Sequence, residues 1–124
     1  MTKFAKCNLC GNFITFLDDK GPKVVCCNQE MNVLHANTED ASVEKHVPAV
    51  TVNGAEVSVV VGSVKHPMEP EHWIEFIYLE TEKGGQYQKL NAGEEPSATF
   101  KLADDKPKAV YEYCNLHGLW KTEL

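Results

Sequence analysis

The chain contains no arginine, so all twelve of its basic residues are lysines. Arginine supplies the planar fork of donors that grips phosphates and guanine edges in two places at once. Acidic residues outnumber the lysines, and the formal net charge is −6. We therefore expect no binding to nucleic acid, and the overall field of the protein repels an anionic ligand at long range.

Two kinds of hydrophobic segment are also missing. No apolar run approaches the ~18 residues of a membrane-spanning helix, and the N-terminal MTKFAKCNLCG has no apolar core of a secretory signal. These absences predict a cytoplasmic protein without a membrane partner, in a compartment that keeps thiols reduced. Five cysteines in such a compartment favour metal binding, and an odd number fits a disulfide framework poorly.

No segment shows a helical 3.6-residue period, and we identify no internal repeat. From residue 37 onward, short β-like runs alternate with turn residues. The sequence AVTVNGAEVSVVVG (49–62) predicts a hairpin whose type I′ turn is Asn53-Gly54. The rhythm predicts an antiparallel sandwich or barrel, with further strands at residues 73–81, 86–90, 98–103 and 108–114.

Four of the five cysteines lie in the first 36 residues, around a short strand (12–17) and a turn (18–23). They are Cys7, Cys10, Cys26 and Cys27. Four sulfurs suit a tetrahedral zinc or iron ion, and a module this small cannot fold on hydrophobic burial alone. Neighbouring side chains of a strand point to opposite faces, so two adjacent cysteine ligands require a bent backbone. A purely structural zinc ion and disulfides are the alternatives. Residues 37–45 read as a linker.

The rest of the chain offers a second set of metal ligands, namely His46, His66, His72, Cys114 and His117. All five lie in loops or near strand ends, where one end of a sandwich can gather them. His35 stands apart and reads as an ordinary surface or packed histidine. Five ligands exceed the four of structural zinc. A blue-copper site with Met68 as axial ligand would leave two histidines over. Iron accommodates five ligands and leaves a sixth position open. A thiolate ligand donates electron density to the iron.

The sequence resembles the desulfoferrodoxins, the two-iron superoxide reductases, over essentially its whole length. CNLC and CC are similar to the desulforedoxin-like iron–thiolate centre of that family, and EKHVP, HPMEPEHWIEFIYL and YCNLHGLWK to its catalytic iron centre. The resemblance implies an all-β protein: a desulforedoxin-like metal module (1–36) followed by an immunoglobulin-like antiparallel β-sandwich of seven strands (37–124), assembled as a homodimer.

The resemblance also implies the activity and the cofactors. Two iron ions would be bound, one by four cysteines and one by four equatorial histidines and the axial Cys114. The reaction would be one-electron reduction of superoxide to hydrogen peroxide, with electrons from rubredoxin or a similar donor. Glu44 would close on the oxidised iron after turnover, and Lys45 would attract superoxide. On the residues alone, these two read as a solvated pair in a linker.

Two rival functions have different signatures. One is a redox or metal-binding module without enzymatic activity, holding zinc at the cysteines. The other is a superoxide dismutase, in which the oxidised metal regains its electron from a second superoxide. The thiolate and the Glu44 cap both favour reduction over dismutation, and the lysine beside an open iron position favours a substrate over simple electron transfer.

Overall fold

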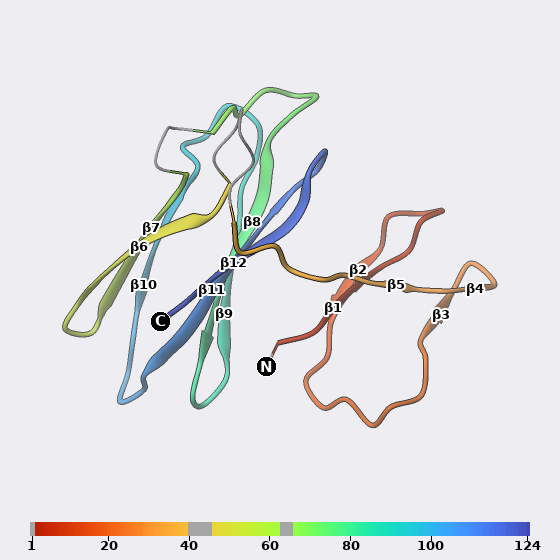
Figure 1. Cartoon of the computed structure of the whole chain (residues 1–124), viewed down its shortest axis with the longest axis horizontal. Coiled ribbons are helices and arrows are strands. Elements are labelled where there is room, and N and C mark those ends of the chain that lie inside the picture. Colours follow the sequence, from red (N-terminus) through yellow and green to blue (C-terminus); the bar gives the residue numbers. More distant parts are fainter. Residues whose placement is uncertain (1, 40–45, 63–65) are drawn as a thin grey trace. The chain divides into compact units, whose positions relative to one another are not determined.

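The computed structural model describes residues 2–39, 46–62 and 66–124, and every regular element within those ranges is a β-strand (Figure 1). The chain divides into two compact units, Met1–His35 and Ala36–Leu124. In the described part of the chain, no helix is long and apolar enough to cross a bilayer. The predicted all-β class is therefore confirmed.

The first unit is a small sheet and a separate hairpin. Strand β1 (Phe4–Lys6) lies between β2 (Phe13–Thr15) and β5 (Asn32–Val33), and the hairpin consists of β3 (Val25–Cys26) and β4 (Gln29–Glu30). The predicted strand at 12–17 is confirmed in its central three residues by β2. The buried core cluster of this unit consists of Ala5, Cys7 and Met31. So small a core cannot by itself offset the loss of chain entropy on folding.

The β3–β4 hairpin turns sharply at the second cysteine of the Cys26-Cys27 pair. Cys26 pairs with Gln29, so Cys27 and Asn28 form a two-residue turn. Both have positive φ, 54° and 60°, which is the type I′ pattern. The left-handed conformation at Cys27 is the bent backbone that two adjacent ligands require.

The second unit is a sandwich of seven antiparallel strands in two sheets, drawn as two layers in Figure 1. The three-stranded sheet has the order β10-β7-β6, and the four-stranded sheet has the order β12-β11-β8-β9. The strands are β6 (Pro48–Asn53), β7 (Glu56–Val61), β8 (Ile74–Thr81), β9 (Gly85–Lys89), β10 (Ser97–Lys101), β11 (Pro107–Cys114) and β12 (Gly118–Glu123). The predicted seven-stranded sandwich is confirmed.

Alternate residues of facing strands fill the space between the two sheets. Strand β7 contributes Val57, Val59 and Val61, and the opposing sheet contributes Ile77, Leu79 and Val110, all at most 1% exposed. Cys114, at the end of β11, belongs to the same cluster and is 0% exposed. The fifth cysteine is thus placed inside the sandwich by the period-two pattern of its own strand.

The β6–β7 hairpin is confirmed, but the predicted type I′ turn at Asn53-Gly54 is wrong. Asn53 pairs with Glu56, so the central residues are Gly54 and Ala55. Gly54 has a φ of 61°, and Ala55 is not among the residues with positive φ, which is the type II′ pattern. This turn needs positive φ only at its first central residue, where glycine adopts it without a steric cost. Asn53 instead extends the strand.

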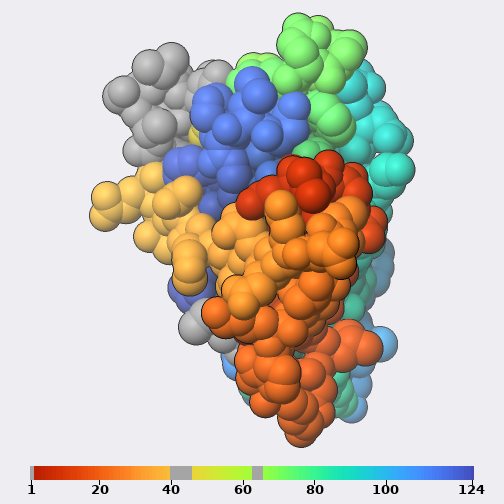
Figure 2. Space-filling view, turned by 90° about the vertical axis from the view of Figure 1, so that its right-hand side faces the viewer, coloured from red at the N-terminus to blue at the C-terminus, as the bar shows by residue number. Residues whose placement is uncertain are grey.

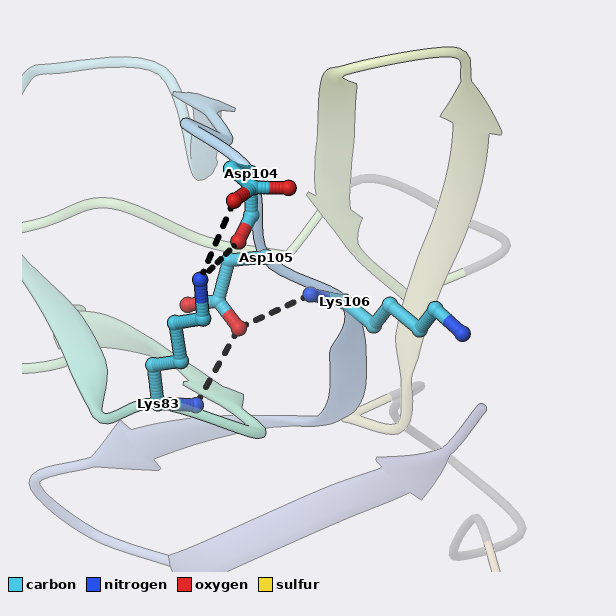
Figure 3. A network of polar contacts seen from close by, with 4 residues as sticks. All are labelled: Lys83, Asp104, Asp105 and Lys106. Carbon is cyan, nitrogen blue, oxygen red and sulfur yellow. Dashed lines mark hydrogen bonds and ion pairs between the residues drawn. The ribbon is translucent and has the colours of Figure 1, made fainter.

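At one end of the sandwich, polar contacts tie the β8–β9 turn to the β10–β11 loop. The backbone N–H groups of Lys83 and Lys106 donate to Asp105 Oδ1 at 3.1 and 2.8 Å, and the Lys83 ammonium contacts Asp104 (Figure 3). The same loops line an open hollow of about 460 Å³. Strand β8 runs away from its histidine-bearing start toward this end, and β11 runs from this end toward Cys114. The other end therefore carries the predicted ligands.

Candidate metal centres

The structure gathers all five predicted ligands of the second set at one end of the sandwich. His46 precedes β6, His66 follows β7, His72 precedes β8, Cys114 ends β11, and His117 lies in the β11–β12 turn. Because paired strands run antiparallel, the start of one strand and the end of its neighbour meet at the same edge of the sheet. Side chains that lie far apart in the sequence thereby reach one point.

The spacing of the five donor atoms fits a single metal ion. All of them lie within 4.8 Å of one another. His46 Nε2 is 3.2 Å from His117 Nδ1, and Cys114 Sγ is 3.8 Å from the same Nδ1. Metal–ligand bonds of about 2.0–2.3 Å place opposite donors about 4.0–4.6 Å apart and adjacent donors about 3 Å apart. Four nitrogens and one sulfur therefore match the shell of one ion.

Groups outside the donor set hold the histidine rings. His66 Nδ1 lies 2.7 Å from the Pro67 carbonyl oxygen, and an N–H donated there leaves Nε2 as the metal-binding nitrogen. The Trp120 ring stacks on His46, with centroids 4.6 Å apart and planes 12° apart. Trp120 Nε1 also donates to the His117 carbonyl at 3.1 Å. The rings of His46 and His66 are therefore held by groups that are not themselves ligands.

Burial is unequal around this cluster, which we call the histidine–cysteine centre. His46, His66 and Cys114 are buried, His72 is half-buried, and His117 is exposed. The sulfur side faces the apolar core, whereas the side formed by His72 and His117 opens to solvent. Among the ligands, His72 and His117 are therefore the ones that a small solute reaches from solvent.

The four N-terminal cysteines form a second cluster, the four-cysteine centre, whose sulfurs also lie within 4.8 Å of one another. Cys10 Sγ is 3.6 Å from Cys26 Sγ. The side chain of Asn12 donates to Cys26 Sγ at 3.6 Å, and its backbone N–H donates to Cys10 Sγ at 3.5 Å. Cys7 is buried, whereas Cys10 and Cys27 are exposed. The centre thus reaches the surface of its unit.

The ionisation of the four thiols favours a bound cation in the four-cysteine centre. Backbone N–H groups of Cys10 and Leu9 lower the pKa of the Cys7 thiol to about 6. Hydrogen bonds with Cys10, then Cys7 and Cys26, raise the pKa of Cys27 to about 12. The Cys7 thiol therefore ionises easily, whereas hydrogen bonds with the other cysteines raise the pKa of Cys26 and Cys27, so these two thiols resist ionisation. A bound metal ion removes that conflict by ligating all four thiolates.

Two segments of the chain match known protein families. Residues 38–123 match the family described as desulfoferrodoxin, and residues 2–34 match the desulfoferrodoxin N-terminal domain.

The chain belongs to the desulfoferrodoxin family.

Individual relatives agree with this assignment. A desulfoferrodoxin of Syntrophotalea carbinolica is 46% identical over 118 residues, which are 95% of this chain and 93% of that protein. The crystal structure of the superoxide reductase from Treponema pallidum superposes with a TM-score of 0.87 at 38% identity, over 99% of this chain and 98% of the other. A superoxide reductase (1Fe-SOR) from Giardia intestinalis has a TM-score of 0.56 at 37% identity, and covers 65% of this chain and 99% of its own. The resemblance seen in the sequence is thereby confirmed.

In this member of the family the two centres share a five-residue turn, contrary to the expectation of no repeat. Cys-Asn-Leu-Cys-Gly (7–11) and Cys-Asn-Leu-His-Gly (114–118) differ only at their fourth residue. Both end on a glycine with positive φ, 84° at Gly11 and 88° at Gly118. We call each turn a ligand knuckle. The repeat becomes visible in the sequence once the two segments are aligned on their glycines.

The remaining predicted residues have different outcomes. His35 is exposed and belongs to neither cluster. Met68 is half-buried against the core, and its sulfur accepts a hydrogen bond from Ile74 N at 3.4 Å, so it is not one of the five donors. Glu44 and Lys45 lie outside the described residues.

Proposed function

We propose that the chain is a superoxide reductase, which adds one electron and two protons to superoxide to form hydrogen peroxide. The observation that carries this function is a buried cysteine gathered with four histidines at one end of the sandwich. The superoxide reductase from Treponema pallidum shares the fold over nearly the whole chain.

The chain binds two iron ions. We assign the first to Cys7, Cys10, Cys26 and Cys27, and the second to His46, His66, His72, Cys114 and His117. The second ion, when bound in its ferrous form, supplies the electron that reduces superoxide, and the thiolate ligand adds electron density to it.

The protein's own contribution is a site with one closed and one open side. The apolar residues around Cys114 exclude water from the sulfur, which keeps the thiolate in a low-dielectric setting. The contacts of His66 with Pro67 and of Trp120 with His46 fix the rings that surround the ion. The exposed side at His117 is the route by which a small anion enters and a neutral product leaves.

We further assign catalytic roles to the two residues that precede His46. Lys45 carries the positive charge that draws an anion toward the open side, in a protein whose net charge is −6. Glu44 is the carboxylate that closes the site after the electron has left. Both assignments rest on the family resemblance and on the sequence position next to a ligand.

The supply of electrons and the setting are also part of the proposal. A rubredoxin-like donor reduces the protein, and the exposure of Cys10 and Cys27 supports delivery at the four-cysteine centre. Residues 1–36 form the electron-accepting module, and residues 37–124 form the catalytic domain. We place the protein in the cytoplasm as a homodimer.

The test is Cys114→Ser in the iron-loaded protein. We expect a folded sandwich that has lost the thiolate-to-iron absorption band and superoxide reduction, because serine provides no soft anionic ligand. Visible spectra and superoxide consumption are the measurements. An unchanged band from the catalytic iron would refute the assignment of Cys114.

Peroxide yield separates reduction from dismutation. A reductase forms one hydrogen peroxide for each superoxide and consumes an external reductant. A dismutase forms one for every two superoxides and needs none. A yield of one half without reductant consumption would replace the proposed function by the rival.

A further inference from the structure

We propose that Asn115 is a positioning residue that holds His72 in place relative to Cys114 and His117. The inference rests on the proposed metal ligands and adds to them a residue with no ligand atom of its own. Asn115 lies inside the second ligand knuckle, directly after Cys114 and two residues before His117.

The Asn115 side chain bonds the backbone on both sides of His72. Its Oδ1 accepts from the N–H of Trp73 at 2.9 Å, and its Nδ2 donates to the carbonyl of Glu71 at 2.9 Å. Its backbone N–H also donates to the carbonyl of Trp73 at 3.2 Å. Three hydrogen bonds from one residue therefore flank a single ligand.

The opposite side of the His72 backbone is held by its own loop. His72 and Glu69 exchange backbone hydrogen bonds of 3.0 and 2.9 Å, which closes a tight turn. With both sides bonded, the main chain at His72 has little freedom left. Figure 2 shows the loop around residues 66–73, in green, reaching the surface beside the blue C-terminal segment that contains the knuckle.

The hydrogen bonds of Asn115 join two ligand-bearing segments that are far apart in the sequence. The His72 ring lies at 5.1 Å from the His117 ring, centroid to centroid, with planes 78° apart. Side chains that orient metal ligands from outside typically change metal affinity or activity by about 10–100-fold when removed. Asn115 acts on the backbone of one ligand while its own position is fixed by its neighbours in the sequence, Cys114 and His117.

The first ligand knuckle shows that the turn itself does not need this amide. Asn8 occupies the same place between Cys7 and Cys10, and it is exposed. Among the residues that the structure describes, its side chain has no hydrogen-bond partner. The bonds of Asn115 to the His72 loop are therefore the feature that distinguishes the second knuckle, and Asn8 is a matched control.

The experiment compares Asn115→Ala, Asn115→Asp and Asn8→Ala in the full-length, iron-loaded protein. Ferrous samples are incubated with EDTA, and iron remaining in the histidine–cysteine centre is read from the thiolate-to-iron band after oxidation. We expect iron release at least tenfold faster for Asn115→Ala. Asn115→Asp should be intermediate, because it keeps the acceptor for Trp73 N–H and loses the donor to Glu71. Asn8→Ala should match the wild type at this centre.

A second readout does not depend on iron. In metal-free protein, hydrogen exchange of the Trp73 amide should be faster in Asn115→Ala than in wild type and unchanged in Asn8→Ala. If Asn115→Ala fails to fold, the rate of iron release from Asn115→Asp decides the matter: a wild-type rate would overturn the inference.

Wild-type iron release and wild-type Trp73 exchange in a stable Asn115→Ala protein would overturn the inference and leave the proposed function intact. A wild-type protein that shows no thiolate-to-iron band would instead contradict the proposed function. Trp73 exchange would then still report on whether Asn115 holds the His72 loop.

Discussion

At the scale of single residues, Cys114 occupies a place that a valine or isoleucine fills in an ordinary sandwich. It lies in the core cluster with Ile74 and Val110 and is 0% exposed. A buried cysteine usually packs as a small hydrophobic residue. Here four imidazoles meet its sulfur at the edge of that core, so the residue that packs is also the one that binds the metal.

Charge near the open side sets the rate of encounter with superoxide. Attraction is screened over ~8–10 Å at physiological salt, so a nearby lysine acts on the last approach while the net charge of −6 opposes it. We predict that Lys45→Ile slows the bimolecular reaction at least tenfold, which is about 1.4 kcal/mol of barrier. Pulse radiolysis of both proteins measures this rate.

The salt dependence provides the control for that prediction. The wild-type rate should fall as salt rises, and the rate of the variant should fall less or should rise, since the remaining charge is repulsive. Equal rates and equal salt slopes would return Lys45 to the status of a solvated linker residue.

In the four-cysteine centre, the Asn12 side chain donates a hydrogen bond to Cys26 Sγ. A hydrogen bond donated to a ligating sulfur stabilises the reduced, more negative centre and raises its potential. We predict that Asn12→Ala lowers the reduction potential by tens of millivolts, measured by a spectroscopic redox titration. Asn8→Ala is the control, because the described structure gives its side chain no sulfur partner. The same potential in both variants would contradict the role of Asn12.

At the scale of the elements, Asp105 links the β8–β9 turn to the β10–β11 loop (Figure 3). Hydrogen bonds from the Thr81 side chain and from the backbone of Lys106 and Lys83 lower the pKa of Asp105. A carboxyl group whose pKa is lower in the folded chain than in the unfolded chain stabilises the fold at pH values above its unfolded pKa, about 3.9. This stability is lost as the pH falls through the pKa of the folded state. We predict that Asp105→Asn lowers the free energy of unfolding at pH 7, because asparagine accepts the same N–H groups without a charge.

Denaturation of metal-free protein at pH 7 and near pH 3 measures that difference, which should shrink at the lower pH. Asp104→Asn is the matched control, because it removes the same charge from a side chain that is fully exposed, and asparagine tolerates the φ of 51°. A pH-independent difference for Asp105→Asn would contradict the assignment.

Much of the fold and of the ligand set could be predicted from the sequence. The β6–β7 hairpin was predictable because alternating valines flank an Asn-Gly pair, but the turn type depends on which dipeptide the strand register leaves unpaired. The two-residue strands β3 and β4 are too short to carry a pattern. The roles of Asn115 and Asn12 were not predictable, since asparagines are common in loops. Asn115 finds its partner Trp73 42 residues away.

At the scale of the whole molecule, the two centres belong to separate units. All five donors of the histidine–cysteine centre come from Ala36–Leu124, and all four of the four-cysteine centre from Met1–His35. The Giardia intestinalis superoxide reductase covers 65% of this chain with 99% of its own length. The sandwich therefore contains all five donor atoms of the histidine–cysteine centre.

We predict that Cys10→Ser abolishes or changes the four-cysteine centre and leaves superoxide reduction with an artificial donor largely intact. The first unit depends on its four thiolates, whereas the second has its own core. Iron content, spectra and superoxide consumption measure the two outcomes. Complete loss of activity in a variant that keeps its second iron would contradict the division into 1–36 and 37–124.

The small core of the first unit affects how long the protein survives in a cell. We expect that unit to unfold without its metal, because it buries too little surface, whereas the sandwich has a larger core of its own. We expect chains made during iron starvation to carry an unfolded N-terminal segment that proteases cut first. The abundance of the intact chain would then follow the iron supply, through degradation and without any change in synthesis.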